Sequence, residues 1–319
     1  MWAELPEYQA YHLPTVKYCW YISSSKEGDM TMADGLFPKR KPLTKADIKR
    51  LKESLPKKVE ISSEGTKVTE HDEEVVDVAP ILESHKDEIS VPLSAEEIRA
   101  FQVYASMLKE KNKVMNLTAV DDDKGIAMKH FIDSLTLCPY IREEEAKSKK
   151  EKLTFVDVGT GAGFPGLPVK ISCPELSVTL MDSLDKRLKF LDEVITALGL
   201  SDCTTVHSRA EDAGRNKKYR EKYDIVTARA VARLSVLAEY CLPLVKVGGV
   251  FLAMKAHSEE EETEAGKAIA LLGGTIEKTD TFKLPGTDME RSIIVVRKIR
   301  PTPARFPRKA GTPSKTPIV

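Results

Sequence analysis

A glycine-rich turn follows an apolar strand pattern in the stretch FVDVGTGAGFPGLPVK, residues 155–170. Read from Gly161, the spacing is G-x-G-x-x-G, in which glycines let the backbone approach a pyrophosphate at the N-terminus of a helix. Read from Asp157, the spacing is D-x-G-x-G-x-G, with a carboxylate at the end of the strand. The turn therefore predicts a bound nucleotide and leaves its identity open.

Strand and helix patterns alternate from Leu153 onward. Strands are predicted over 153–158, 177–181, 203–206, 223–228 and 250–255, and helices over 163–172, 184–198, 231–245 and 258–272. This alternation predicts a doubly wound, Rossmann-like α/β sheet. Two further strands, at 275–283 and 291–298, follow without an intervening helix. We therefore expect an antiparallel hairpin at one edge of a seven-stranded, mostly parallel sheet.

Four regions are predicted along the chain. They are a mostly flexible N-terminal extension (1–80), a small helical subdomain with a linker (81–150), the sheet domain (151–298) and a basic, extended C-terminal tail (299–319). The extension is charge-dense and shows no sustained period. Three interpretations of it stay open: a binding arm that uses Lys39, Arg40 and Lys41, a solvated appendage, or a leader that is not made because the natural start is Met30 or Met32.

The helical subdomain is predicted from capping and periodicity, with order beginning near Pro92. Ser94 and Glu97 form an S-x-x-E capping box, and apolar residues follow at helical spacing from Ile98 to Leu108. A second helix is predicted over 124–137. The charged string REEEAKSKKEK, at 142–152, is predicted to be a linker.

Charge and cysteine content exclude several classes of protein. Lysine and arginine together number 49, as do aspartate and glutamate, so the net charge gives no case for bulk electrostatic binding to nucleic acid. The five cysteines have no C-x-x-C spacing, and the histidines no H-x-x-x-H spacing, which argues against a disulfide framework and a metal site. No apolar run approaches the roughly 20 residues of a membrane span. We expect a cytoplasmic monomer with no membrane partner.

The Asp157 carboxylate distinguishes between candidate nucleotides. The pyrophosphate of NAD would lie close to a like charge. S-adenosylmethionine carries a sulfonium and an ammonium group and has the opposite requirement. Pro165 and Pro168 favour the same ligand, because a proline has no N–H to donate to a phosphate. The cofactor contacts predicted in this turn are Asp157, Gly159, Gly161 and Gly163.

Acidic residues follow the second and third predicted strands. Asp182 lies 182 − 163 = 19 residues after Gly163, at the spacing of a carboxylate that accepts both ribose hydroxyls. Ala210 and Glu211 are predicted to lie in the loop after the third strand, where an adenine edge would lie. Three strand ends in register indicate a nucleoside site.

The sequence after the fourth strand restricts the methyl acceptor. It reads DIVTARAVARL, without the D/N-P-P-Y/F clamp that often holds exocyclic amines. Carbon attack on a pyrimidine would need a cysteine nucleophile, and Cys241 lies within a predicted helix. A ring nitrogen with a free lone pair, such as guanine N7, needs no base, so positioning alone could carry catalysis.

No catalytic residue is assigned with certainty, and four positioning candidates emerge. Arg229, Arg233 and Lys255 lie at strand ends, where they could bind acceptor or cofactor. The alternative is a structural salt bridge for Arg229 and Arg233, and a solvated side chain for Lys255. His130 could pair with Asp133 on the same helical turn near the cleft. A buried structural histidine is the favoured alternative.

The motifs VMNLTAV, KHFIDSL, DVGTGAGFPGLPVKI, LMDSLDKRLKFL, SRAED and YDIVTARAVARL occur in this order. With them, the chain closely resembles the glucose-inhibited division protein B family from about residue 90 to the C-terminus. The resemblance implies a methyltransferase that uses S-adenosylmethionine to modify guanine N7 in 16S ribosomal RNA, near the decoding centre of the small subunit. Loss of this activity is linked in the family to streptomycin resistance. Residues 1–80 depart from the family pattern.

The resemblance also implies partners and contacts. The partner would be 16S ribosomal RNA or the small ribosomal subunit, during ribosome biogenesis. Family cofactor contacts would fall on Gly159, Phe164, Ala210, Glu211 and Arg229. The basic tail is expected to bind RNA, so that deletion of residues 299–319 would weaken RNA binding and spare cofactor affinity.

Two rival functions stay open. A small-molecule methyltransferase would keep the cofactor site and ignore RNA. A non-enzymatic RNA-binding assembly factor would bind small-subunit RNA without turnover. A nicotinamide enzyme is disfavoured by Asp157.

Overall fold

The computed structural model describes residues 76–85, 88, 92–256 and 259–319. The interpretations of the N-terminal extension as an arm, an appendage or an unmade leader fall on residues 1–75, outside the described residues. Within the described residues, no helix is both long and apolar enough to cross a bilayer.

Seven strands form one sheet with the order β3-β2-β1-β4-β5-β7-β6. The strands are β1 (Thr154–Val158), β2 (Ser177–Asp182), β3 (Cys203–His207), β4 (Tyr223–Arg229), β5 (Val245–Lys255), β6 (Gly274–Lys283) and β7 (Glu290–Lys298). Strands β1 to β5 pair in parallel, and β7 is antiparallel to both β5 and β6. The predicted doubly wound sheet with its edge hairpin is confirmed. The strand order reverses between β1 and β4, which places the ligand-binding switch point at the end of β1.

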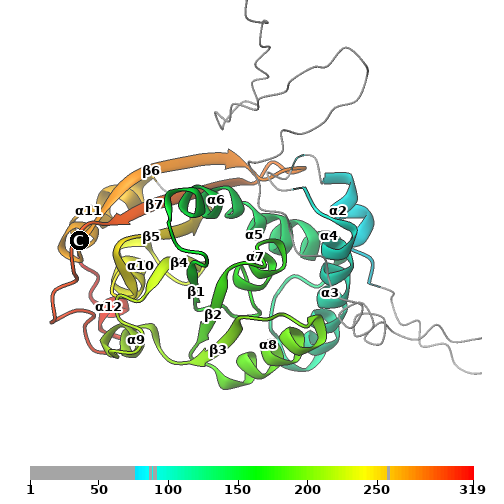
Figure 1. The fold of residues 1–319 in the computed structure, drawn as a ribbon, viewed down its shortest axis with the longest axis horizontal. Coiled ribbons are helices and arrows are strands. Elements are labelled where there is room, and N and C mark those ends of the chain that lie inside the picture. The colour runs from blue at the N-terminus through cyan, green and yellow to red at the C-terminus, as the bar shows by residue number, and fades with distance from the viewer. Residues whose placement is uncertain (1–75, 86–87, 89–91, 257–258) are drawn as a thin grey trace, which may run out of the picture. The chain divides into compact units, whose positions relative to one another are not determined.

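Helices cover both faces of this sheet (Figure 1). The helices that follow β1 are α7 (Gly166–Ser172), α8 (Asp185–Leu198), α9 (Ala210–Arg215), α10 (Leu234–Cys241), α11 (Glu259–Leu271) and α12 (Thr312–Lys315). Those that precede it are α2 (Ala79–His85), α3 (Ala95–Met115), α4 (Asp123–Gly125), the π-helix η1 (Ile126–Ile132), α5 (Asp133–Leu135) and α6 (Cys138–Lys147). In Figure 1, α3, α7 and α8 lie on one side of the sheet and α9, α10 and α11 on the other.

The core consists of two apolar clusters, one on each face. The larger cluster joins Phe101 and Phe131 of the N-terminal helices to Phe155 of β1. The smaller cluster joins Leu237 of α10 to Phe251 of β5. The N-terminal helices therefore share a core with the sheet and fix the wall of the ligand site on that side.

The capping box that begins α3 is confirmed. The Glu97 N–H donates to Ser94 Oγ at 3.2 Å, and the Ser94 N–H donates to Glu97 Oε2 at 2.8 Å. The helix predicted over 124–137 is also present, running through α4, η1 and α5 with a π-helical turn in the middle. That π-helical turn carries His130.

Two boundaries predicted for the helical region are wrong. Order does not begin near Pro92, because α2 precedes it and packs a fully buried Leu82 beside α3. The charged linker is also wrong over 142–147, where α6 continues to Lys147. Arg142 pairs with Glu145 and with Glu175, so these charges stabilise a helix in tertiary contact.

The helix predicted over 231–245 is too long at its C-terminal end. Helix α10 ends at Cys241, and β5 already begins at Val245. Pro243 lies between them and has no N–H to continue the helix.

The prediction of an extended C-terminal tail is wrong. Thr302 and Phe306 are buried, and α12 forms near the end of the chain. The Arg220 guanidinium donates to the carbonyls of Thr302 and Phe306, both at 2.7 Å. Proline-rich sequence without a period gives no sign of such contacts, because they depend on an arginine some 80 residues away.

Candidate active site

The turn after β1 requires glycine at several positions. Gly159, Gly161 and Gly163 have φ values of 73°, 60° and 105°, which are strained for any other residue. A Cβ at Gly163 would also overlap the Tyr104 hydroxyl of α3 and lie 2.9 Å from Leu191 Cδ2. Gly163 therefore allows the turn to pack against α3, and it does not line the pocket.

Asp157 lies beneath the turn. Its side chain is fully buried, and Oδ2 accepts hydrogen bonds from Thr160 Oγ1 at 2.7 Å and from the Gly166 N–H at 2.9 Å. Burial raises the pKa of this carboxyl to about 6. Its other oxygen, Oδ1, has no hydrogen-bond partner in the described part of the chain. Asp157 therefore holds the turn from behind and is not part of the pocket wall.

The N–H groups of the turn are used within the protein. Gly159 and Thr160 donate to the Met181 carbonyl at 2.8 and 3.1 Å, and Gly161 donates to Asp182 Oδ2 at 2.9 Å. Gly163 and Phe164 both donate to the Thr160 carbonyl, at 2.9 and 3.0 Å. A pyrophosphate would find few free donors here, which agrees with the preference for a ligand without phosphate.

A pocket of about 530 Å³ opens above this turn, at the carboxyl ends of the strands. Its volume falls within the range of small-molecule sites. Predicted contacts that line it are Gly159, Gly161, Phe164, Asp182, Ala210, Glu211, Arg229 and His130.

Asp182 ends β2 with its carboxylate at the pocket wall. Oδ1 accepts from the Leu184 N–H at 2.9 Å, and Arg187 lies 3.4 Å from Oδ2. The residue is 3% exposed, so the position of its side chain is fixed before any ligand arrives. Each carboxylate oxygen has two lone pairs, so Asp182 can still accept hydrogen bonds from ribose hydroxyls.

Glu211 and Ala210 begin α9. The prediction of a loop at these positions is wrong, because a short helix starts at Ala210. Glu211 is buried, and its Oε1 accepts a hydrogen bond from the Gly311 N–H at 2.8 Å. With Asp182 it places two carboxylates at the pocket wall. These residues therefore fit S-adenosylmethionine, which Asp182 and Glu211 would hold.

Arg229, at the end of β4, lines the pocket and also forms the salt bridge considered as its alternative role. Its Nη1 donates to Asp133 Oδ2 at 2.8 Å and to the Lys129 carbonyl at 2.9 Å. The guanidinium lies 5.3 Å from the centre of the Phe164 ring. Asp133 also accepts from Arg291 Nε at 2.7 Å, so two arginines share one buried carboxylate.

His130 stacks on Phe164, with ring centres 4.4 Å apart and planes 18° from parallel. Its Nε2 lies 2.7 Å from Thr118 Oγ1, and its Nδ1 lies 3.4 Å from Arg229 Nη2. Burial, followed by the Arg229 charge, lowers the pKa of His130 to about 4, so the imidazole is neutral at pH 7. The expected pair with Asp133 is absent from the contacts of His130 within the described residues, because Arg229 binds both side chains.

Two other candidates lie outside the pocket wall. Arg233 occupies the N-cap position of α10, and its side chain pairs with Glu264. Lys255 donates to the Ala232 carbonyl at 3.0 Å and pairs with Glu261 at 2.8 Å. Both residues join the start of α10 to α11. Their positions at strand ends in the sequence gave no indication of these contacts.

Several pocket residues were missed at the level of sequence. The family-like motif VMNLTAV contains Leu117 and Thr118, but nothing in its pattern indicated that they face the cofactor turn. The C-terminal segment contributes Gly311 and Ser314, which no local pattern relates to the turn. The other missed lining residues are Val158, Thr160, Ala162, Met181, Ser183, Arg187, Ser208, Arg209, Ala230, Val231 and Tyr240.

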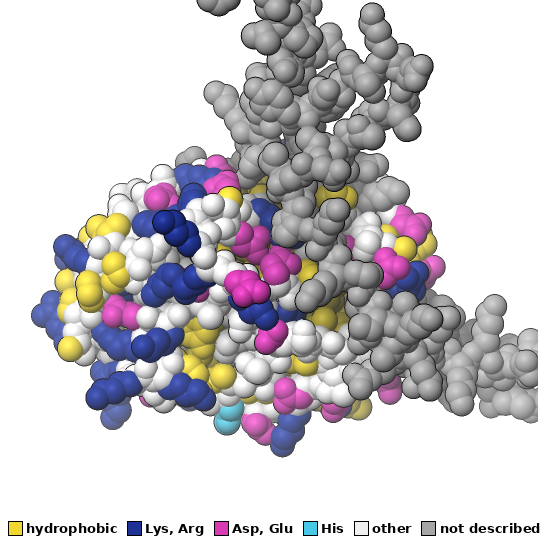
Figure 2. Space-filling model, viewed as in Figure 1, with side chains coloured by type: hydrophobic (Ala, Val, Ile, Leu, Met, Phe, Trp, Pro, Cys, Tyr) yellow, Lys and Arg dark blue, Asp and Glu magenta, His cyan; other side chains and the backbone are white. Residues whose placement is uncertain are grey.

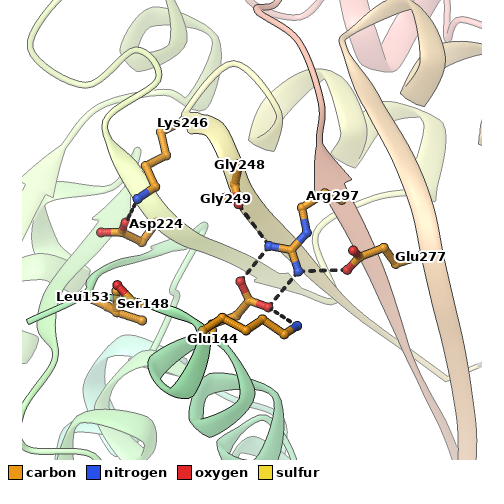
Figure 3. Close-up of a pocket in the computed structure, with 10 residues that line it drawn as sticks. Glu144, Ser148, Leu153, Asp224, Lys246, Gly248, Gly249, Glu277 and Arg297 are labelled. Atoms are coloured by element: carbon orange, nitrogen blue, oxygen red, sulfur yellow. Dashed lines mark hydrogen bonds and ion pairs between the residues drawn. The ribbon is translucent and has the colours of Figure 1, made fainter. Parts of the chain in front are cut away.

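A second pocket, of about 420 Å³, lies near the starts of β1 and β4 (Figure 3). Figure 3 shows Arg297 bonded to Glu144, Glu277 and the Gly248 carbonyl, and Lys246 paired with Asp224. Its charges neutralise one another, so this pocket is a structural ion-pair network. Among the described residues, no cluster of histidine, cysteine and carboxylate side chains could hold a metal.

A nucleoside pocket at the switch point, with the turn N–H groups bonded internally, suits an enzyme that binds S-adenosylmethionine, and the chain is a methyltransferase of that class. Residues 97–291 match the family model described as GidB, rRNA small subunit methyltransferase G. The chain belongs to this family.

Relatives agree with the family model. The chain is 52% identical over 247 residues to "Ribosomal RNA small subunit methyltransferase G" of Acetivibrio thermocellus, covering 77% of this chain and 99% of the relative. It is 50% identical over 232 residues to the protein of the same name from Bacillus subtilis, covering 72% and 95%. The CurJ carbon methyltransferase structure matches with a TM-score of 0.44 and 10% identity, over 70% of each chain.

Proposed function

We propose that this chain transfers the methyl group of S-adenosylmethionine to N7 of one specific guanine in 16S ribosomal RNA, near the decoding centre. Methylation of small-subunit ribosomal RNA follows from membership of the family. The guanine, its N7 atom, and action as a cytoplasmic monomer are the finer parts of the proposal.

One observation carries the choice of a ring nitrogen as the acceptor. The pocket wall beside the cofactor turn offers His130, Phe164 and Arg229, and none of them is a free base. His130 is neutral, but Thr118 and Arg229 occupy its ring nitrogens. Such a wall can orient an acceptor that attacks through a lone pair, whereas an acceptor that must first lose a proton would lack a partner.

The residues then have distinct tasks. Asp182 and Glu211 would hold the ribose and adenine ends of the cofactor, which supplies an electrophilic methyl group when bound. Phe164 and His130 present a stacked aromatic surface that limits where a planar base can lie. Arg229 carries a planar fork of donors at the same place, suited to a base oxygen, a phosphate or a carboxylate. Distance and angle, rather than proton transfer, would set the rate.

The substrate guanine has to leave its stack to reach this pocket. Exposed cations surround the region of α9 and the C-terminal segment, where Figure 2 shows lysine and arginine side chains gathered. The exposed members are Arg209, Arg215, Lys217, Lys218, Arg305, Lys309 and Lys315. They provide the local positive charge that the neutral chain as a whole does not.

The test uses S-adenosylmethionine with a labelled methyl group and small ribosomal subunits, or their extracted RNA, from cells that lack the enzyme. We expect label in RNA from at least one of these substrates. Neither label in RNA nor binding of RNA would favour a small-molecule methyltransferase. Tight RNA binding without any label would favour the assembly factor.

A further inference from the structure

The end of the chain folds back over α9 and α10. Arg220 holds the carbonyls of Thr302 and Phe306, and Arg215 Nε donates to the Pro307 carbonyl at 2.8 Å. The structure uses these arginines as anchors for the chain end.

A buried ion pair continues the attachment. Glu239 of α10 is 1% exposed and accepts from the Arg308 backbone N–H at 2.7 Å, from Nε at 2.9 Å and from Nη2 at 2.6 Å. Arg308 Nη1 donates to the Thr316 carbonyl at 2.8 Å. Arg308 therefore ties α10 to both ends of residues 308–316, which include α12.

Residues 308–316 also reach the pocket. The Gly311 N–H donates to Glu211 Oε1, and Gly311 and Ser314 line the pocket together with Tyr240 of α10. Gly311 has a φ of 80°, and a Cβ built there meets no described atom within 4 Å. The backbone at Gly311 thus turns toward the carboxylate that is expected to hold the cofactor.

We propose that residues 311–316 form a wall of the cofactor site on the Glu211 side, so that cofactor binding and docking of the chain end stabilise each other. The proposal rests on the proposed function only for the identity of the cofactor. It replaces the expectation that the tail serves RNA alone and that its loss spares cofactor affinity.

The coupling follows from linkage. Undocking of residues 311–316 removes the Gly311 donor from Glu211 and opens one side of the pocket. A ligand that binds the docked form more tightly shifts the equilibrium toward docking by the same factor by which docking improves its binding.

A shortened chain tests the inference directly. A variant that ends at Ala310 keeps Phe306 and Arg308, and so keeps the bonds to Arg220 and to Glu239 of α10, but lacks the proposed wall. We expect its calorimetric affinity for S-adenosylmethionine to fall roughly tenfold or more, because a buried carboxylate loses a donor and the pocket loses one side. The matched control is Lys309→Ala, which removes an exposed cation of the same segment and should leave affinity within about twofold.

The full-length protein supplies a second readout that does not depend on the folding of a variant. Trypsin cleavage after Lys315 is followed by mass spectrometry with and without S-adenosylmethionine. We expect saturating cofactor to slow this cleavage roughly fivefold or more, because cleavage needs the undocked segment.

Equal affinity of the shortened and full-length chains, or equal cleavage rates with and without cofactor, would overturn the inference. Ribosomal RNA methylation is measured separately. Failure of the proposed acceptor would therefore appear in the methylation assay, and failure of the pocket wall in the binding constants and cleavage rates.

Discussion

At the scale of the residue, the site is organised by carboxylates that are committed before a ligand binds. Asp157 fastens the turn from below, Asp182 accepts from the turn and from Leu184, and Asp133 fixes Arg229. All three of these aspartates are buried. Fixed side chains of this kind lose little conformational freedom when the ligand arrives.

Asp182→Ala should weaken binding of S-adenosylmethionine by roughly tenfold or more, because the proposed ribose acceptor and the partner of the Gly161 N–H are lost together. Isothermal titration calorimetry measures the change. The matched control is Asp185→Ala, which removes an exposed carboxylate three residues later that pairs with Lys189. Unchanged affinity in Asp182→Ala would remove this residue from the site.

His130 should make stability depend on pH. Its pKa in the folded chain, about 4, lies below the 6.5 of an unperturbed histidine, so the unfolded chain binds the extra proton first as pH falls. Between pH 7 and pH 5 the folded state should lose about 2 kcal/mol through this residue alone. The pKa of Asp157 is raised in the folded chain, so this residue should instead increase the stability of the folded state as pH falls below about 6.

Urea unfolding of the wild type and of His130→Gln at the two pH values isolates the histidine, because Asp157 is present in both. His130→Gln should lose less stability on acidification than the wild type. His207→Gln changes an exposed histidine and should behave like the wild type. Parallel losses in the wild type and His130→Gln would contradict the assignment.

At the scale of the element, the turn between β1 and α7 joins the sheet to α3. Gly163→Ala places a methyl group against Tyr104 and Leu191 at a positive φ, and we expect a loss of roughly 3 kcal/mol or more in the free energy of unfolding. Gly248 has a φ of 86°, but a Cβ added there meets no atom within 4 Å. Gly248→Ala should therefore cost about 1 kcal/mol through backbone strain alone. Equal losses in urea unfolding would show that the contact with α3 contributes nothing.

Local sequence predicted the elements whose signal is local. The apolar strands, the Ser94 capping box and the edge hairpin all follow from spacing along the chain. Helix α9 escaped prediction because six residues with little apolar content carry no period. The continuation of α6 and the folded C-terminal segment escaped because they depend on Glu175 and on Arg220, which are distant in sequence.

The same division applies to the site. Strand ends in a doubly wound sheet meet at one edge, so Asp182, Glu211 and Arg229 could be brought together from sequence. Which strand-end cation faces the pocket depends on the nearest carboxylate. Arg233 pairs with Glu264 and Lys255 pairs with Glu261, so neither side chain lines the pocket. Asp157 was chosen for its charge, whereas its contacts give it a structural position beneath the turn.

At the scale of the whole molecule, positive charge is local rather than general. Lys217 and Lys309 are exposed, and within the described residues neither is in an ion pair. If they contact phosphates, the double variant Lys217→Ala/Lys309→Ala should bind 16S RNA more weakly. The plot of log affinity against log salt should also become less steep, its slope falling in magnitude by about 1 to 2. Cofactor affinity should not change.

The control for this prediction is Lys147→Ala, which removes an exposed lysine beside the second pocket. Filter binding across a salt series gives both slopes. The same slope in the double variant as in the wild type would place the RNA on another surface.

The central claim is that the pocket delivers the methyl group to N7 of one guanine by positioning alone. Its most direct measurement maps the modified base. RNA labelled by the wild-type enzyme is treated with borohydride and aniline, which break the chain at N7-methylguanine, and the fragments are sequenced. The account predicts one break, at a single guanine near the decoding centre. Labelled RNA that stays intact under this treatment would contradict the account, because the methyl group would then lie on another atom.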